Sequence, residues 1–196
     1  MGVNVFGGAP DVIARMTLKY FGIDPEKEMK FIAIGAPESR LAAMKQGLIA
    51  ATLVSVPEDF QAKKMGFHVL ARAYELFSYP DGGLVTTVKK IKERPDEIRR
   101  VIKAGIKANR YIRADREGAV QVMMDWQKID RESAIAAHES LSKIFNDDGS
   151  VPEKGLRLVI EENKKIAKVD REVSINEVAD LSILREVQAE LGIKGR

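Results

Sequence analysis

Three turns in the first third of the chain carry residues that could hold an anion. In each of them a proline stands where an amphipathic helix is predicted to begin, a position at which its missing N–H costs nothing. Backbone N–H groups at a helix start, together with the helix dipole, attract a carboxylate, sulfonate, phosphate or nitrate. The turns are Gly7-Gly8-Ala9-Pro10-Asp11, Gly35-Ala36-Pro37-Glu38 and Ser55-Val56-Pro57-Glu58-Asp59. The residues predicted to contact a ligand are Gly7, Gly8, Ala9, Pro10, Ser55, Val56 and Pro57.

The acid that follows each proline supports a second interpretation. Asp11, Glu38 and Glu58 would complement the helix dipole without any ligand, so each turn is also an ordinary helix-start signal. Gly7-Gly8 is not a dinucleotide fingerprint, because the Gly-x-Gly-x-x-Gly pattern is absent. Arg40 is a further candidate, since a guanidinium matches a carboxylate in a fork, but a local ion pair with Glu38 is an equal alternative.

Residues for catalysis or metal binding are scarce. The 196 residues include no cysteine, which excludes thiolate zinc sites, iron–sulfur clusters, a cysteine nucleophile and disulfides. His68 and His138 have no second histidine at metal-ligand spacing, and Ser55 lacks the Gly-x-Ser-x-Gly context of a hydrolase. Asp147-Asp148 lacks the spaced carboxylates of a calcium loop. We therefore expect no metal, no cofactor and no catalytic site, and a binding function is favoured.

The elements that would position these turns differ between the two halves of the chain. Up to about Pro80, short apolar runs alternate with amphipathic stretches, the pattern of βαβ units around a mostly parallel sheet. The strands expected there are residues 3–6, 31–34, 49–54 and 67–71, and the helices are residues 10–21, 37–46 and 57–65. In an open parallel sheet all strand-to-helix turns lie at the carboxyl edge, where ligands bind.

After a composition shift near residues 75–83, one more strand is expected at residues 84–88. The rest is predicted to be largely helical. Helices are expected from Pro95, around Val120–Trp126 and Ile135–Phe145, from Pro152 to Ile166 and over Leu181–Leu191. Trp126, Met123 and Met124 share a helix and are expected to lie in the core rather than in a ligand pocket.

Charge and hydropathy argue against two classes of protein, those that bind nucleic acid and those that span a membrane. The net charge of +3 comes from 32 basic and 29 acidic residues that are mixed along the chain, which argues against a nucleic-acid interface. No apolar run approaches the roughly 20 residues that span a bilayer. The start has no secretory signal pattern and resembles a strand already under way, so we expect an incomplete chain.

Several segments in this order resemble a known family. They are Gly2-Val3-Asn4-Val5, the glycine-rich helix start after it, Tyr20-Phe21-Gly22-Ile23-Asp24-Pro25, Arg40-Leu41-Ala42-Ala43-Met44-Lys45-Gln46-Gly47 and Glu93-Arg94-Pro95-Asp96-Glu97-Ile98. Together they resemble the solute-binding proteins of ABC importers for nitrate, aliphatic sulfonates, taurine and thiamine-precursor-like solutes, which have the periplasmic-binding-protein type 2 fold. The resemblance runs from the first residue to about Ala114.

The resemblance implies two α/β lobes that close on a solute by a hinge. Residues 1–78 would form lobe two, and residues 79–196 the returning, largely helical and incomplete part of lobe one. It implies a small anionic or zwitterionic solute held without chemistry, an ABC permease as partner, and a periplasmic or extracellular, membrane-associated location. Two departures leave the solute class open: Gly8-Ala9, where a Ser or Thr is common, and Ala50-Ala51, where Asp-Ala is common.

Two other functions remain open at this stage. Regulators reuse this fold as a ligand-sensing effector domain, and enzymes of thiamine-precursor synthesis use the same scaffold. An incomplete lobe would also leave apolar sheet surface uncovered, so we expect self-association, including a domain-swapped dimer.

Overall fold

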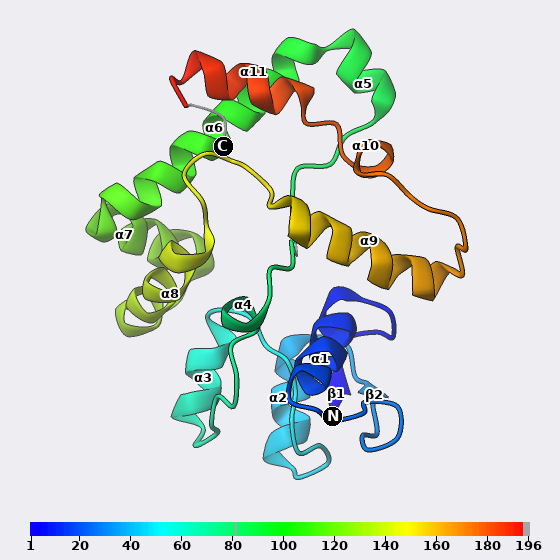
Figure 1. Ribbon diagram of the computed structural model, residues 1–196. Helices are drawn as coiled ribbons and strands as arrows, with labels where there is room; N and C mark the ends of the chain where they lie inside the picture. The colour runs from blue at the N-terminus through cyan, green and yellow to red at the C-terminus, as the bar shows by residue number, and fades with distance from the viewer. Residues whose placement is uncertain (81, 194–196) are drawn as a thin grey trace. The chain divides into compact units, whose positions relative to one another are not determined.

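The chain folds into two compact units. The computed structural model describes residues 1–80 and 82–193, coloured along the chain in Figure 1. Unit 1 contains Met1–Tyr79 and Glu161–Val169, and unit 2 contains Pro80–Ile160 and Asp170–Arg196. The assignment of residues 1–78 and 79–196 to two lobes stays a prediction.

Unit 1 contains a small parallel sheet. Strand β1 (Gly2–Val3) pairs with β2 (Ile32–Ala33), with Gly2 opposite Ile32 and Val3 opposite Ala33. On the other side of β1, Thr52 forms a single parallel bridge with Gly2, and its hydroxyl donates to the Gly2 carbonyl over 2.9 Å. The expected α/β class is therefore confirmed, in a helix-rich form with a two-stranded sheet.

Four helices and the second part of α9 (Glu153–Ala167) accompany this sheet. The four helices are α1 (Ala9–Tyr20), α2 (Pro37–Lys45), α3 (Glu58–Lys64) and the short α4 (Ala73–Leu76). Helix α1 packs against α4, and α2 packs against α3. The buried apolar side chains of the unit are Val3, Val12, Ile13, Ala14, Leu41, Ala43, Ile49 and Ala62. Gly2 lies in close contact with this core, because a Cβ there would lie 2.5 Å from the Ile49 side chain.

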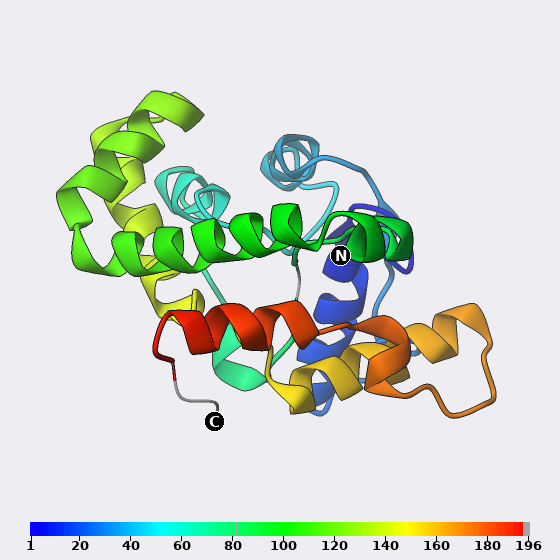
Figure 2. The ribbon, with the colours of Figure 1, turned by 90° about the horizontal axis from the view of Figure 1, so that it is seen from above.

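Unit 2 is helical. Its elements are α5 (Val88–Glu93), α6 (Pro95–Ala114), α7 (Arg116–Gln127), α8 (Arg131–Ile144), the first part of α9 (Glu153–Ala167), α10 (Ile175–Val178) and α11 (Ser182–Glu190). Helices α6 and α11 lie alongside each other (Figure 2) around a core of Ile106, Ile183 and Val187. Helix α7 packs against α8. None of the described helices has both the length and the apolar character needed to cross a membrane.

All five expected strands are shorter than predicted or absent among the described residues: β1 and β2 have two residues each, where residues 3–6 and 31–34 were expected. The region 49–54 contributes only the Thr52 bridge, and residues 67–71 and 84–87 form no strand. The prediction of strands at 67–71 and 84–88 was therefore wrong for the described chain. A strand needs a neighbour for its N–H and C=O groups, and apolar periodicity does not show whether one exists. Leu84 and Val85 are 70% and 95% exposed.

Trp126 corrects another expectation. Helix α7 buries Ala119, Val120 and Met123, whereas the Trp126 side chain is 85% exposed. Trp126 lies in the last turn, one residue before α7 ends at Gln127, and therefore beyond the buried part of the helix. The expected core position was right for Met123 and wrong for Trp126.

Candidate functional site

The start of α1 is occupied by a carboxylate of the chain itself. The Gly7 N–H donates to Asp11 Oδ2 over 2.8 Å, and Arg15 Nε donates to Asp11 Oδ1 over 2.8 Å. Asp11 is only 4% exposed. Gly7 has φ = +76°, a left-handed conformation that suits glycine and turns its N–H toward this carboxylate. Asp11 therefore occupies a position that a bound anion could take at this helix start.

The remaining groups of this turn have different roles. The Gly8 N–H donates to the Val5 carbonyl over 3.3 Å, and Pro10 has no N–H to offer. Among the described residues, the Ala9 N–H has no acceptor. A Cβ on Gly8 would lie 3.0 Å from Asn4 Oδ1, so glycine lets the Asn4 side chain approach the turn. That amide oxygen is buried without a hydrogen-bond partner in the described part of the chain.

Arg40 is the buried cation of unit 1. It projects from α2, is 3% exposed, and donates from Nη1 to the Gly35 carbonyl over 2.9 Å. Its Nε is buried with no hydrogen-bond acceptor among the described residues. Burial lowers the pKa of Arg40 from its ordinary value, and the negative charges of Glu58 and Glu38 oppose that shift. The local ion pair with Glu38 that the sequence allowed is not formed within the described structure.

The third turn carries Glu58, whose negative charge acts on Arg40. Helix α3 begins at Glu58, with Pro57 as its N-cap, one residue later than the expected start at Pro57. The Ser55 carbonyl accepts from the Asp59 N–H over 3.0 Å, the peptide bond between Val56 and Pro57 is cis, and the Ser55 side chain is exposed. Glu58 Oε2 is buried and, like Arg40 Nε, has no partner among the described residues.

These groups belong to one edge of the sheet. Asn4 follows β1, and Gly35 follows β2 and donates its N–H to the Asn4 carbonyl over 3.1 Å. Ser55 and Glu58 follow the segment that bridges to β1 at Thr52. Since the strands are parallel, all of these residues lie at their carboxyl ends, as the sequence predicted for its three turns. Near this edge, one guanidinium nitrogen, one carboxylate oxygen and one amide oxygen are buried without a hydrogen-bond partner among the described residues.

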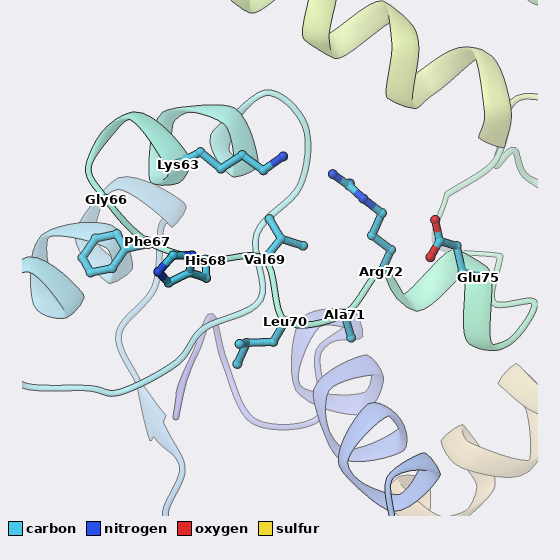
Figure 3. A pocket seen from close by; sticks show the side chains of 9 residues that line it. All are labelled: Lys63, Gly66, Phe67, His68, Val69, Leu70, Ala71, Arg72 and Glu75. Carbon is cyan, nitrogen blue, oxygen red and sulfur yellow. The ribbon is translucent and has the colours of Figure 1, made fainter.

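A second feature of unit 1 lies outside the predicted residues. An open hollow of about 660 Å³ follows the extended segment between α3 and α4, shown in Figure 3. It is lined by Lys63, Gly66, Phe67, His68, Val69, Leu70, Ala71, Arg72 and Glu75. None of the seven predicted ligand residues belongs to this lining. In the sequence, only the apolar run at residues 67–71 marks this place. Its interpretation as a paired strand left no room for a hollow there.

The histidines and acids do not form a metal centre in the described residues, where no group of three or more potential ligands gathers. His138 is buried on α8, with Nε2 2.7 Å from the Ile112 carbonyl. His68 is exposed and lines the hollow. These positions agree with the sequence expectation of packed or surface histidines.

Comparison with known proteins assigns the chain to a family. A family model described as NMT1-like matches residues 1–126. The chain belongs to the NMT1-like family. This is a family of periplasmic binding proteins of type 2 that bind nitrate, sulfonates or thiamine precursors. No curated protein and no solved structure shows a significant match to the chain. In this NMT1-like chain, the matched residues include the whole carboxyl edge and the whole hollow.

Proposed function

We propose that this NMT1-like chain is the solute-binding component of an ABC importer. It holds a small anionic or zwitterionic solute in a cleft between two lobes and releases it unchanged. The observation that carries the proposal is the family match over the segment that gathers three helix starts at one sheet edge. Such an edge is where ligands bind in open α/β folds.

The charges at this edge favour a solute with an acidic group. Arg40 offers a buried N–H donor, and the Ala9 N–H at the start of α1 offers a second one. Glu58 Oε2 and Asn4 Oδ1 offer acceptors that suit an ammonium group. We propose that the solute contacts this edge at the turn Gly7–Pro10, where the Ala9 N–H has no acceptor among the described residues, and at the turn Ser55–Pro57. Since the acceptors are also present, a zwitterion is as acceptable as a simple anion.

The wider context follows from the same proposal. An importer component works on the outer side of the cytoplasmic membrane, so we propose a periplasmic or extracellular, membrane-associated location and an ABC permease as partner. The site needs no metal and no cofactor, because recognition by N–H, guanidinium and carboxylate groups requires none.

Exposed apolar residues support self-association. Leu84 and Val85, which precede α5, are 70% and 95% exposed, and Val88, its first residue, is 67% exposed. We propose that two chains cover these residues in a dimer, including a domain-swapped form. Light scattering coupled to size-exclusion chromatography should give the mass of a dimer, and Val85→Lys should shift the species toward the monomer. A wild-type chain that runs as a monomer at all concentrations would contradict this proposal.

A thermal-shift screen tests the binding function. Nitrate, sulfonates, carboxylates and pyrimidines are each added to the purified chain, with sodium chloride at equal ionic strength as the control. A solute at about 100 times its Kd stabilises the folded state by about 2.7 kcal/mol. For a chain of this size that corresponds to a rise in Tm of roughly 5–10 °C. No rise with any solute would contradict the proposal.

A further inference from the structure

We propose that the hollow lined by residues 63–75 binds a small organic acid, with its carboxylate between Lys63 and Arg72 and its apolar body along Val69 and Leu70. The inference rests on the proposed binding function. It adds a second binding site on unit 1 and names the chemical class of its ligand. Three observations carry it: two cations that converge on the hollow, backbone N–H groups without an acceptor, and apolar side chains in part of the wall.

The cations come from opposite sides of the hollow. Lys63 lies in the last turn of α3, and Arg72 immediately precedes α4. In Figure 3 the nitrogen atoms of the two side chains point toward each other across the hollow. Arg72 is held in place by Asp59, with 3.2 Å between Nη1 and Oδ2, while Lys63 has no ion partner among the described residues. A carboxylate between them would receive charge-assisted hydrogen bonds from both sides.

The backbone between these two residues adds donors. The Phe67 N–H donates to the Ala62 carbonyl over 3.0 Å, which closes the end of α3. The following N–H groups, from His68 to Ala71, have no acceptor among the described residues. Because the segment has no neighbouring strand among the described residues, those of its N–H groups that face the hollow are available to a ligand there.

Part of the wall is apolar, and the volume of the hollow suits a small molecule. Leu70 is 83% exposed and Val69 is 38% exposed, and both line the hollow together with Phe67. Its volume of about 660 Å³ lies within the range of roughly 300–1,000 Å³ that small-molecule sites occupy. Glu75 also lines the hollow, next to Arg72 in Figure 3. Its charge would repel a second carboxylate, so a monoacid with an apolar body fits better than a diacid.

The test compares probes that separate the acidic and apolar parts. Isothermal titration calorimetry of the full chain is carried out with hexanoate, acetate, hexanol and adipate. We expect hexanoate to bind at least about tenfold more tightly than each of the other three, because only hexanoate satisfies both the cations and the wall without facing Glu75 with a second charge. Equal affinity for acetate and hexanoate, or no binding of hexanoate, would overturn the proposal.

Matched variants place the binding in the hollow. Lys63→Gln should weaken hexanoate binding about five- to tenfold by removing one charge-assisted hydrogen bond, and Leu70→Asp should weaken it at least as much. Lys45→Gln removes a lysine from the last turn of α2, and Leu48→Asp changes another exposed leucine, so neither should alter binding. Hexanoate affinity unchanged in Lys63→Gln and Leu70→Asp would refute the site.

The same variants separate this inference from the proposed function. One outcome is that a solute of the thermal-shift screen stabilises Lys63→Gln and Leu70→Asp as much as the wild type, while hexanoate does not bind. That outcome would refute the proposed site in the hollow and retain the binding function. Failure of every solute with the wild type would refute the binding function itself.

Discussion

Replacing Asp11 by alanine tests whether an internal carboxylate occupies the anion position at the start of α1. Its Oδ2 accepts the Gly7 N–H over 2.8 Å, its Oδ1 accepts Arg15 Nε over 2.8 Å, and the residue lies in the first turn of the helix. The substitution Asp11→Ala removes both hydrogen bonds and the favourable interaction with the dipole. It also leaves the Gly7 N–H without its acceptor.

The size of the effect follows from these contacts. The buried hydrogen bond from Gly7 to a charged acceptor contributes about 1.5–3 kcal/mol, and a partly exposed ion pair such as that with Arg15 contributes below about 1 kcal/mol. The dipole adds about 0.3–1 kcal/mol. Arg15 keeps a second partner, Glu26, with 2.6 Å between Nη1 and Oε1, so part of its interaction survives. We expect Asp11→Ala to destabilise α1 by about 3 kcal/mol.

Amide hydrogen exchange measures this change at α1 itself, independently of unit 2. The matched control is Glu38→Ala, which removes an exposed acid from the first turn of α2 that makes no hydrogen bond among the described residues. The control should cost less than about 1 kcal/mol. Sodium formate should restore part of the lost protection in Asp11→Ala, because formate can occupy the vacated position, whereas sodium chloride should not. Equal costs for the two variants, or equal effects of the two salts, would refute the reasoning.

Three further predictions concern other parts of the chain. Arg40→Met should destabilise unit 1 by about 2–3 kcal/mol through loss of the hydrogen bond to Gly35, and the double variant with Glu58→Gln should lose about 1 kcal/mol less than the sum of the single variants in urea unfolding. Additive losses would show that the two charges do not interact. Lys128→Gly should stabilise unit 2 by about 1 kcal/mol, because Lys128 ends α7 at φ = +55°, and Lys128→Ala should give no such gain by circular dichroism. The hydrogen bond from the Ser174 N–H, and to a smaller extent Arg171, lower the pKa of Glu177 from its ordinary value of 4.5. The stability that Glu177 adds to α10 is therefore present above pH 4.5 and is lost as the pH falls through the lower pKa of the folded state. Glu177→Gln should remove this acid sensitivity from the exchange rates of α10, and an unchanged pH profile would contradict it.

Local signals in the sequence predicted the longer helices well, whereas the short helices α4, α5 and α10 were not predicted. Proline starts, glycine stops and a 3.6-residue period are properties of contiguous residues, and α2 and α6 begin at Pro37 and Pro95 as expected. The strands could not be predicted in the same way, because pairing depends on residues far away in the sequence. Val3 pairs with Ala33 in the sheet and is buried, whereas Val85 pairs with no strand among the described residues and is exposed.

In the candidate site, too, local features could be predicted from the sequence and long-range packing could not. The position of Arg40 at the carboxyl edge follows from its place in a helix that starts after a strand, and the sequence marked it as an anion-binding candidate. Its burial beside the charge of Glu58 could not be predicted, because it depends on the packing of α2 against α3. The hollow at residues 63–75 arises from a segment that lacks a strand partner, and no local pattern reports the absence of a partner.

The central claim is that the chain binds a small acidic or zwitterionic solute and does no chemistry on it. Equilibrium dialysis of the purified chain against the mixed solute panel, followed by mass spectrometry of what the protein retains, tests both parts together. The account predicts that at least one acidic or zwitterionic solute is enriched with the protein, at a molar ratio that saturates, and that it is recovered with its mass unchanged. Enrichment of no solute, or recovery of a chemically altered one, would contradict the account.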